Sequence, residues 1–127
     1  MKTENIDGGT LEIWTPKEAH DAFERNEIVL IDVRTPQEFT FERIGGALLA
    51  PMQAFHPEHL PSGGNKQLVL HCGSGVRSRK VAELCLKHGF DKVAHMEGGF
   101  GAWKEAGLTY TGTDMSTGAP KEMAKDG

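Results

Sequence analysis

Short apolar runs alternate with helix-like segments between Leu11 and Met96. Polar or turn-forming residues bound each run, which is typical of short buried strands. The segment Val76–His88 instead carries its apolar residues at helical spacing and ends at Gly89. Strands that alternate with helices predict an α/β domain built on a mostly parallel sheet. The predicted strands are Leu11–Trp14, Ile28–Asp32, Ala47–Leu49, Gln67–His71 and Val93–Met96.

Two further helix starts are written in the sequence as capping motifs. Thr15 and Thr35 are each followed by proline and, three residues on, by Glu18 and Glu38. A threonine N-cap, a proline in the first turn and a glutamate that reaches back to the N-cap together form a capping box. We interpret both motifs as structural signals.

The ends of the chain differ in composition from its middle. We expect residues 1–10 to be an N-terminal extension, residues 11–108 to form one domain, and residues 109–127 to be a polar, mobile tail, because the last segment has few large apolar residues. A chain of 127 residues fits a single domain with one core.

Charge and hydropathy exclude several classes of function. The formal net charge of −4 argues against a binder of nucleic acid or of anionic membranes, although an anionic substrate is allowed where positive charge is local. No apolar run approaches the roughly 20 residues of a membrane helix, and no apolar stretch follows Met1 as in a secretory signal. We therefore expect a cytoplasmic protein with neither membrane nor nucleic-acid partners.

A single cysteine stands where a predicted strand meets a predicted helix, in His71-Cys72-Gly73-Ser74-Gly75-Val76-Arg77-Ser78. The free backbone N–H groups and the dipole at a helix N-terminus favour negative charge, either a thiolate or a bound oxyanion. Such a position lowers a cysteine pKa from about 8.5 to roughly 3.5–7.5. Gly73 and Gly75 allow the backbone to turn its amides inward around an anion. Cys72 is therefore the candidate nucleophile.

Three cations crowd the first turn of the helix that follows Cys72. Arg77, Arg79 and Lys80 all oppose the helix dipole, and a bound anion would offset this. We favour that function for Arg77, whereas Arg79 is expected to pair with Glu83 and Lys80 to be solvated. Cys85 shares an apolar helix face and is expected in the core.

Cys72 and Cys85 are not expected to form a disulfide. A helix between them separates them by roughly 13 Å, against the limit of about 7 Å between Cα atoms in a disulfide. Arg34 follows another strand at the same sheet edge and could share the Cys72 pocket, but an ion pair with Asp32 is an equally good reading.

The histidines add little to this chemistry. His71 is expected to point to the opposite side of its strand from Cys72, which makes it a poor general base. His56 and His59 lack partners at metal-ligand spacing, so we expect no metal.

The motif HCGSGVRS, with IDVRTPQEF upstream and EGGFGAW downstream, resembles the single-domain rhodaneses, a family of sulfurtransferases, over Leu11–Leu108. The resemblance implies a three-layer domain whose five-stranded, mostly parallel sheet has helices on both faces. It also implies that Cys72 takes sulfur from thiosulfate or a persulfide and passes it to cyanide or a thiol, including a thiol of another protein, without metal or cofactor. The site residues it implies are Cys72 as nucleophile, with Gly73, Ser74, Gly75, Val76, Arg77, Ser78 and Arg34 for substrate or persulfide binding.

Two positions depart from the family pattern, where His and Pro are common and this chain has Glu42 and Gly45. We expect these changes to alter access to the pocket rather than to remove activity. Gly98, Gly99 and Trp103 match the family's last motif, for which turn formation and core packing are the favoured roles.

Two alternative functions remain open. A cysteine phosphatase or arsenate reductase also holds a thiolate in an anion cradle, but its pattern has one residue more between Cys and Arg than the four found here. A smaller cradle favours a sulfur atom over a phosphate. A non-catalytic binding module is the other alternative, since a fold does not determine its function.

Overall fold

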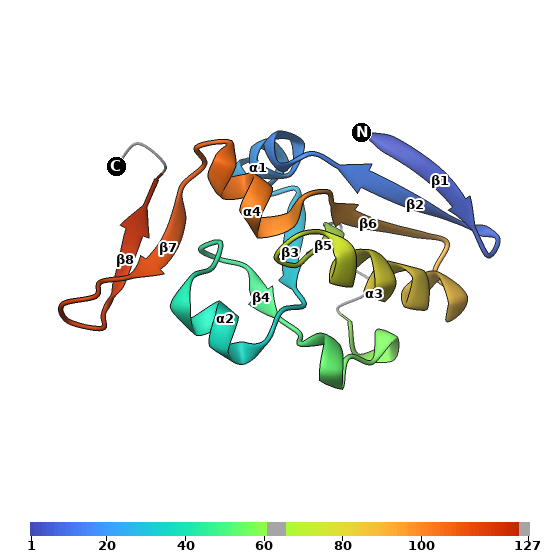
Figure 1. Ribbon diagram of the computed structural model, residues 1–127. Helices are drawn as coiled ribbons and strands as arrows, with labels where there is room; N and C mark the ends of the chain where they lie inside the picture. The colour runs from blue at the N-terminus through green and yellow to red at the C-terminus, as the bar shows by residue number, and fades with distance from the viewer. Residues whose placement is uncertain (61–65, 125–127) are drawn as a thin grey trace.

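A six-stranded sheet forms the centre of the protein in the computed structural model, which describes residues 1–60 and 66–124 (Figure 1). Its strands are β1 (Lys2–Ile6), β2 (Gly9–Trp14), β3 (Ile28–Asp32), β4 (Leu48–Leu49), β5 (Gln67–His71) and β6 (Lys92–Met96). The order across the sheet is β1-β2-β6-β5-β3-β4, and every neighbouring pair is parallel except the β1–β2 hairpin. The protein is therefore α/β with a mostly parallel sheet, as the strand and helix pattern predicts.

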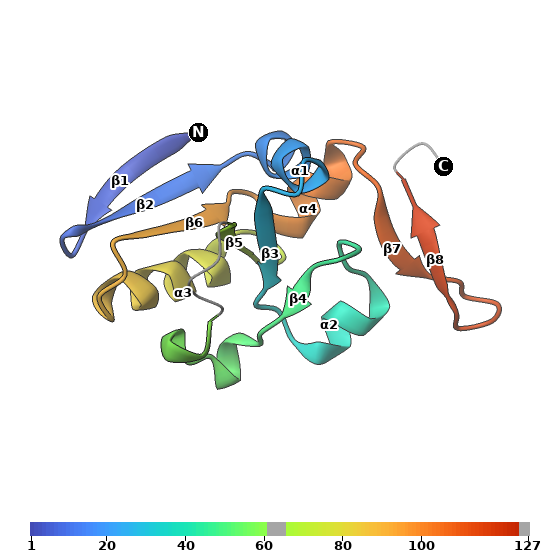
Figure 2. The same cartoon turned by 180° about the vertical axis from the view of Figure 1, so that it is seen from behind.

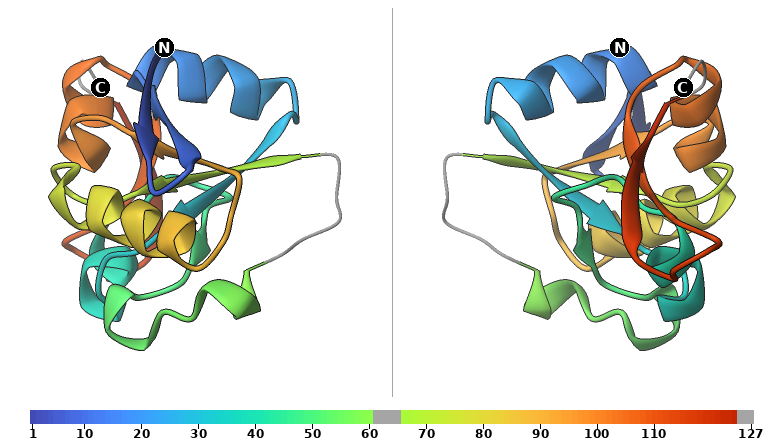
Figure 3. Two further views of the ribbon diagram at one scale, coloured as in Figure 1. Left: turned by 90° about the vertical axis from the view of Figure 1, so that its right-hand side faces the viewer. Right: turned by 90° about the vertical axis from the view of Figure 1, so that its left-hand side faces the viewer.

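Helices cover both faces of the sheet, so the domain has three layers (Figure 3). The helices are α1 (Pro16–Glu24), α2 (Pro36–Phe41), α3 (Val76–Lys87) and α4 (Gly99–Glu105), and two 3₁₀ turns are η1 (Met52–Ala54) and η2 (Pro57–His59).

Alternation along the strands divides the core between the two faces. In β5, Leu70 packs with Val81 and other residues of α3, whereas its neighbour Val69 packs with Ala19 of α1 and Trp103 of α4. Cys72 belongs to the α3 face. No helix in the described residues is long and apolar enough to cross a membrane.

The predicted elements are confirmed with small shifts at their ends. Ile28–Asp32 and Gln67–His71 are strands over the predicted residues, and α3 begins at Val76 as predicted. Both capping boxes are present, with Thr15 bonded to Glu18 and Thr35 bonded to Glu38.

The central sheet has six strands rather than the five predicted, because the first residues of the chain also form a strand. The expected extension at residues 1–10 contains β1, which pairs with β2 from Lys2 opposite Ile13 to Ile6 opposite Gly9. Its side chains are mostly exposed and polar, so it lacks the apolar pattern by which the other strands are recognised. Strand β1 thus forms the edge of the sheet next to β2.

The segment expected to be a mobile tail contains a β-hairpin instead. Its strands β7 (Tyr110–Thr113) and β8 (Pro120–Met123) pair antiparallel and lie at the end of the molecule away from the β1–β2 turn (Figure 2). Backbone hydrogen bonds of 2.7 and 2.8 Å join Thr111 to Arg43 in both directions. Backbone pairing holds most of this segment, and Tyr110 packs against the core. Because the segment has few other large apolar residues, its composition did not reveal the hairpin.

Candidate active site

Cys72 lies at the carboxyl end of β5, in the connection that leads into α3. The strand β5 is flanked by β6 and β3, so this connection opens at the centre of the sheet edge, where ligands bind in open α/β sheets. Gly75 forms the N-cap of α3 with a φ of +99°, a conformation that favours glycine. The turn at Gly75 brings the first amides of α3 back towards Cys72.

The sulfur of Cys72 is surrounded by hydrogen-bond donors. It accepts from the backbone N–H of Gly75 at 3.1 Å and of Ser78 at 3.3 Å, and the Ser78 hydroxyl lies 3.6 Å away. Cys72 is itself buried, with no exposed surface. The structure therefore brings together Cys72, Gly75 and Ser78 of the predicted loop around one sulfur atom.

These contacts set the ionisation of the thiol. Burial is the largest influence and raises the pKa of Cys72, but hydrogen bonds from the backbone and side chain of Ser78 and from the amides of Ser74 and Gly75 outweigh it. The pKa of Cys72 is thus lowered from its usual value. Hydrogen bonds that favour the charged form act here as the helix-start position predicts.

Residues 72–77, from Cys72 to Arg77, are called the Cys72 loop, and its first carbonyls are held from the other side by α4. Phe100 and Gly101 donate their N–H groups to the carbonyls of Cys72 and Gly73, at 2.7 and 3.0 Å. Gly99 has a φ of +60°, and a Cβ there would collide with the Cys72 carbonyl oxygen and lie 2.7 Å from the Gly73 carbonyl carbon. The second glycine of the EGGFGAW motif therefore permits close approach to the Cys72 loop, in addition to forming the predicted turn.

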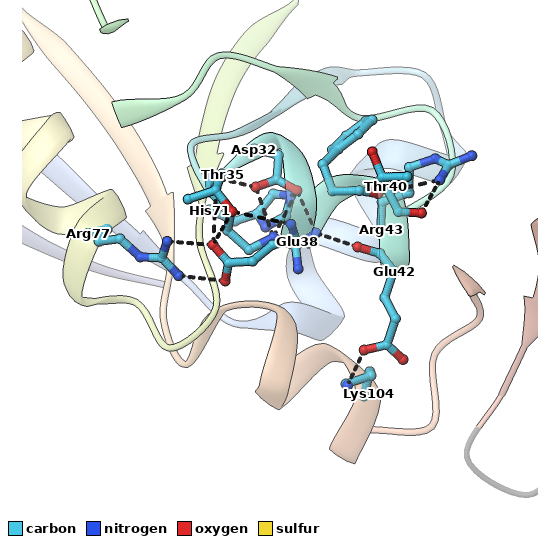
Figure 4. A network of polar contacts seen from close by, with 11 residues as sticks. Asp32, Thr35, Glu38, Thr40, Glu42, Arg43, His71, Arg77 and Lys104 are labelled. Atoms are coloured by element: carbon cyan, nitrogen blue, oxygen red, sulfur yellow. Dashed lines mark hydrogen bonds and ion pairs between the residues drawn. The ribbon is translucent and has the colours of Figure 1, made fainter. Parts of the chain in front are cut away.

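Arg77 forms a salt bridge with Glu38, a residue for which the sequence predicts only helix capping. Its guanidinium donates two hydrogen bonds to the carboxylate of Glu38, at 2.7 and 3.0 Å (Figure 4). The same carboxylate accepts from the N–H of Thr35 at 3.1 Å. Arg77 and the cap together lower the pKa of Glu38 from 4.5 to about 2, with the Arg77 hydrogen bonds as the main cause. The charge of Arg77 is thus balanced by Glu38 in the structure, and the expected role of Arg77 toward a bound anion stays a prediction.

Arg34 lies in a buried ion pair with Asp32, which was one of its two expected roles. Its Nε and Nη2 atoms donate to the Asp32 carboxylate at 2.8–3.0 Å, and Nη2 also donates to the Glu42 carbonyl at 2.6 Å. The guanidinium stacks 4.7 Å from the ring centre of Phe100. These contacts tie the end of β3 to α2 and α4, and they favour the structural reading of Arg34.

The two departures from the family pattern make contacts elsewhere in the fold. Glu42 accepts a hydrogen bond of 3.0 Å from Lys104 of α4 (Figure 4). Gly45 lies against the C-terminal hairpin, since a Cβ there would be 3.2 Å from the Thr111 hydroxyl. Both positions thus help to dock α4 and the hairpin.

Of the remaining cations, Arg79 pairs with Glu83 at 3.6 Å as predicted, and it also pairs with Glu4 of β1 at 2.7 Å. Cys85 is a buried residue of α3 that faces the core, and burial raises the pKa of its thiol to about 11. The lower pKa therefore distinguishes Cys72 from the second cysteine.

The buried histidine of β6 is the polar residue that the sequence analysis missed. His95 is 4% exposed, and its Nδ1 lies 2.9 Å from the Ser78 hydroxyl. Its place in the apolar run Val93–Met96, on the face that also holds Val93, was the available signal. His71 is also fully buried, and its Nε2 lies 3.9 Å from the Asp32 carboxylate (Figure 4). Neither of its ring nitrogens has a hydrogen-bond partner among the described residues.

The loop, the fold and comparisons with known proteins agree on the class of protein. A family model described as the rhodanese-like domain matches residues 15–106. The chain belongs to the rhodanese-like domain family.

Individual relatives are similar over most of the same region. The chain is 37% identical over 93 residues to an uncharacterized protein of Synechocystis sp., of whose length it spans about half (52%), the match covering 73% of this chain. It is 31% identical over 94 residues to the thiosulfate sulfurtransferase GlpE of Actinobacillus succinogenes, covering 74% of this chain and 85% of that protein. The crystal structure of a rhodanese-like domain protein from Staphylococcus aureus superposes with a TM-score of 0.62 at 34% identity, covering 72% of this chain and 90% of the other.

Proposed function

We propose that this protein is a sulfurtransferase that carries sulfane sulfur as a persulfide on Cys72. The observation that carries the proposal is the hydrogen bonding of the Cys72 sulfur by the amides of Gly75 and Ser78 at the start of α3. A thiolate stabilised in this way is a nucleophile at neutral pH. The similarity to a named thiosulfate sulfurtransferase supports the same chemistry.

In the first half of the reaction, the Cys72 thiolate attacks the outer sulfur of a donor. With thiosulfate, a new S–S bond forms on Cys72, the S–S bond of the donor breaks, and sulfite leaves with the bonding electrons. With an organic persulfide, a thiolate leaves instead. In the second half, a thiol or cyanide attacks the outer sulfur of the Cys72 persulfide, and the Cys72 thiolate leaves. Neither half-reaction calls for a metal or cofactor.

The loop residues have distinct roles in this scheme. The amides of Gly75 and Ser78 bond the attacking sulfur of Cys72. We assign the remaining amides of the loop, those of Gly73, Ser74, Val76 and Arg77, to the transferred sulfur, as the family resemblance implies. Preorganised N–H groups stabilise charge where it develops without reorganising during the reaction. Because Glu38 balances the charge of Arg77, we assign Arg77 to fixing the Cys72 loop by joining α3 to α2. The backbone amides and the α3 dipole then stabilise most of the negative charge of the donor.

The size of the cradle favours sulfur over phosphate. Four residues separate Cys72 from Arg77, and the guanidinium that a phosphate would need is already bonded to Glu38 at both of its terminal nitrogens. An incoming phosphate would have to break that pair. The cytoplasmic location and a protein thiol as acceptor stay predictions.

Rates with competing substrates test the proposal. The wild type and Cys72→Ser are compared for thiocyanate formation from thiosulfate and cyanide, for sulfur transfer from glutathione persulfide to a thiol, and for hydrolysis of an aryl phosphate. Cys85→Ser is the matched control. We expect sulfur transfer by the wild type and Cys85→Ser, and its loss in Cys72→Ser. Faster aryl phosphate hydrolysis than sulfur transfer would overturn the proposal.

A further inference from the structure

We infer that His95 is a positioning residue that accepts the Cys72 proton through the hydroxyl of Ser78. The inference rests on the proposed function, because the proton must leave Cys72 before its sulfur can attack a donor. Its basis is a continuous chain of polar atoms from the sulfur to the imidazole. None of the site motifs assigns a role to His95.

Two short contacts form this path from the sulfur to the imidazole. The Cys72 sulfur lies 3.6 Å from the Ser78 hydroxyl oxygen, and that oxygen lies 2.9 Å from His95 Nδ1. A serine hydroxyl donates one hydrogen bond and accepts others, so it can receive one proton as it releases its own. The carbonyl of Gly75, 3.3 Å from the same oxygen, is the other acceptor available to Ser78.

The transfer balances without an added reactant. The S–H bond of Cys72 breaks and leaves its electron pair on sulfur. The proton passes to the Ser78 oxygen while the original Ser78 proton passes to His95 Nδ1. The result is a thiolate and an imidazolium joined by a serine that now donates to the sulfur. The direction of both hydrogen bonds reverses in the step.

His95 has the environment that an acceptor of this kind needs. Burial and the nearby guanidinium of Arg79 lower the pKa of His95, so the imidazole is neutral while Cys72 is still a thiol and can accept its proton. Once protonated, it is surrounded by three carboxylates and one guanidinium. These charged groups are Arg79 and Glu83 of α3, Glu4 of β1, and Glu97 after β6.

An opening beside the imidazole provides a route for the proton to solvent. His95 lines a cavity of about 420 Å³ together with Ser74 and Gly75 of the Cys72 loop and Arg79 and Lys80 of α3. Glu4, which bonds Arg79, comes from β1, so the N-terminal strand completes the charged surroundings of His95.

The test measures the ionisation of Cys72 directly, by the rate of iodoacetamide alkylation against pH. His95→Asn retains a polar group near the Nδ1 position but has no proton affinity in this range, and His88→Asn is the matched control at an exposed histidine. We expect His95→Asn to raise the apparent pKa of Cys72 by about one unit, so that alkylation at pH 6 slows about tenfold. His88→Asn should leave the profile unchanged.

A second measurement leaves His95 unsubstituted and uses the thermodynamic coupling between His95 and Cys72. If the two groups share the proton, removal of the thiolate in Cys72→Ser lowers the pKa of His95 by the same amount, measured from its ring resonances by NMR. In a Ser78→Ala background, His95→Asn should cause no further shift in the Cys72 profile.

Identical Cys72 profiles in the wild type and His95→Asn, or a His95 pKa that does not respond to Cys72→Ser, would overturn the relay. Failure of the proposed function is a separate result. It would appear as absence of sulfur uptake by the wild type at every pH, whereas alkylation would still report whether His95 controls the thiol.

Discussion

The carboxylate of Glu38 bonds both terminal nitrogens of Arg77, at 2.7 and 3.0 Å, across the space between α2 and α3. One glutamate thus caps the first turn of α2 and anchors the last residue of the Cys72 loop. Through this pair, α2, which carries no nucleophile itself, helps to set the shape of the loop around Cys72.

The Glu38–Arg77 pair predicts a pH dependence of stability. Because the folded state lowers the pKa of Glu38 from 4.5 to about 2, its contribution is complete above pH 4.5 and is lost as the pH falls towards 2. Both side chains are about one-third exposed, so solvent screening reduces the contribution to about 1 kcal/mol. Urea unfolding of the wild type and Glu38→Gln should differ by this amount at pH 7 and converge near pH 2. A difference that does not change with pH would contradict the prediction.

Gly99→Ala should damage both stability and sulfur transfer. The new methyl group would meet the carbonyls of Cys72 and Gly73 in a left-handed backbone conformation, at a cost of about 2–4 kcal/mol. Gly107→Ala is the control, because Gly107 also has a positive φ, of +79°, but has open space around its Cα. We expect the control to lose about 1 kcal/mol and to keep the wild-type rate. Equal losses in the two variants would show that close packing of α4 on the loop is unimportant.

Arg34→Lys tests whether the buried pair with Asp32 is structural. Lysine keeps the charge but loses the planar fork that bonds Asp32, so we expect a loss of about 2 kcal/mol in unfolding free energy. The KM for thiosulfate should stay at its wild-type value. Arg25→Lys, at an exposed pair with Glu27, should change stability by less than about 0.5 kcal/mol. A raised KM in Arg34→Lys with unchanged stability would assign Arg34 to the substrate instead.

Cys85 should be unreactive at neutral pH. Burial raises the pKa of its thiol to about 11, so peptide mapping after brief alkylation at pH 7 should find label on Cys72 alone. Cys85→Ala should cost about 1 kcal/mol of stability through lost packing and leave the labelling rate unchanged. Label on Cys85 in the folded protein would contradict the raised pKa of its thiol.

The sequence was sufficient to predict features that depend on local pattern. The strands Ile28–Asp32 and Gln67–His71 and the start of α3 follow from apolar periodicity, and the caps at Thr15 and Thr35 follow from short-range hydrogen-bonding chemistry. The position of Cys72 between a strand and a helix belongs to the same group.

Features that depend on long-range pairing were missed. The Arg77–Glu38 bond joins residues 39 positions apart, and the link from Ser78 to His95 spans 17. Strand β1 and the hairpin of β7 and β8 are held by backbone pairing, with side chains that are mostly polar. Neither distant side-chain pairs nor backbone pairing between polar strands produces a periodic pattern of apolar residues, so the sequence alone did not predict them.

Sulfur on Cys72 is the most direct test of the account. The wild type, Cys72→Ser and Cys85→Ser are incubated with thiosulfate or glutathione persulfide, freed of excess donor, and weighed intact by mass spectrometry, with peptide mapping to locate any adduct. We predict the added mass of one sulfur atom on Cys72 in the wild type and in Cys85→Ser, its absence in Cys72→Ser, and its removal by cyanide or a thiol. A wild-type protein that takes up no sulfur from either donor, or takes it up equally in Cys72→Ser, would contradict the proposed function.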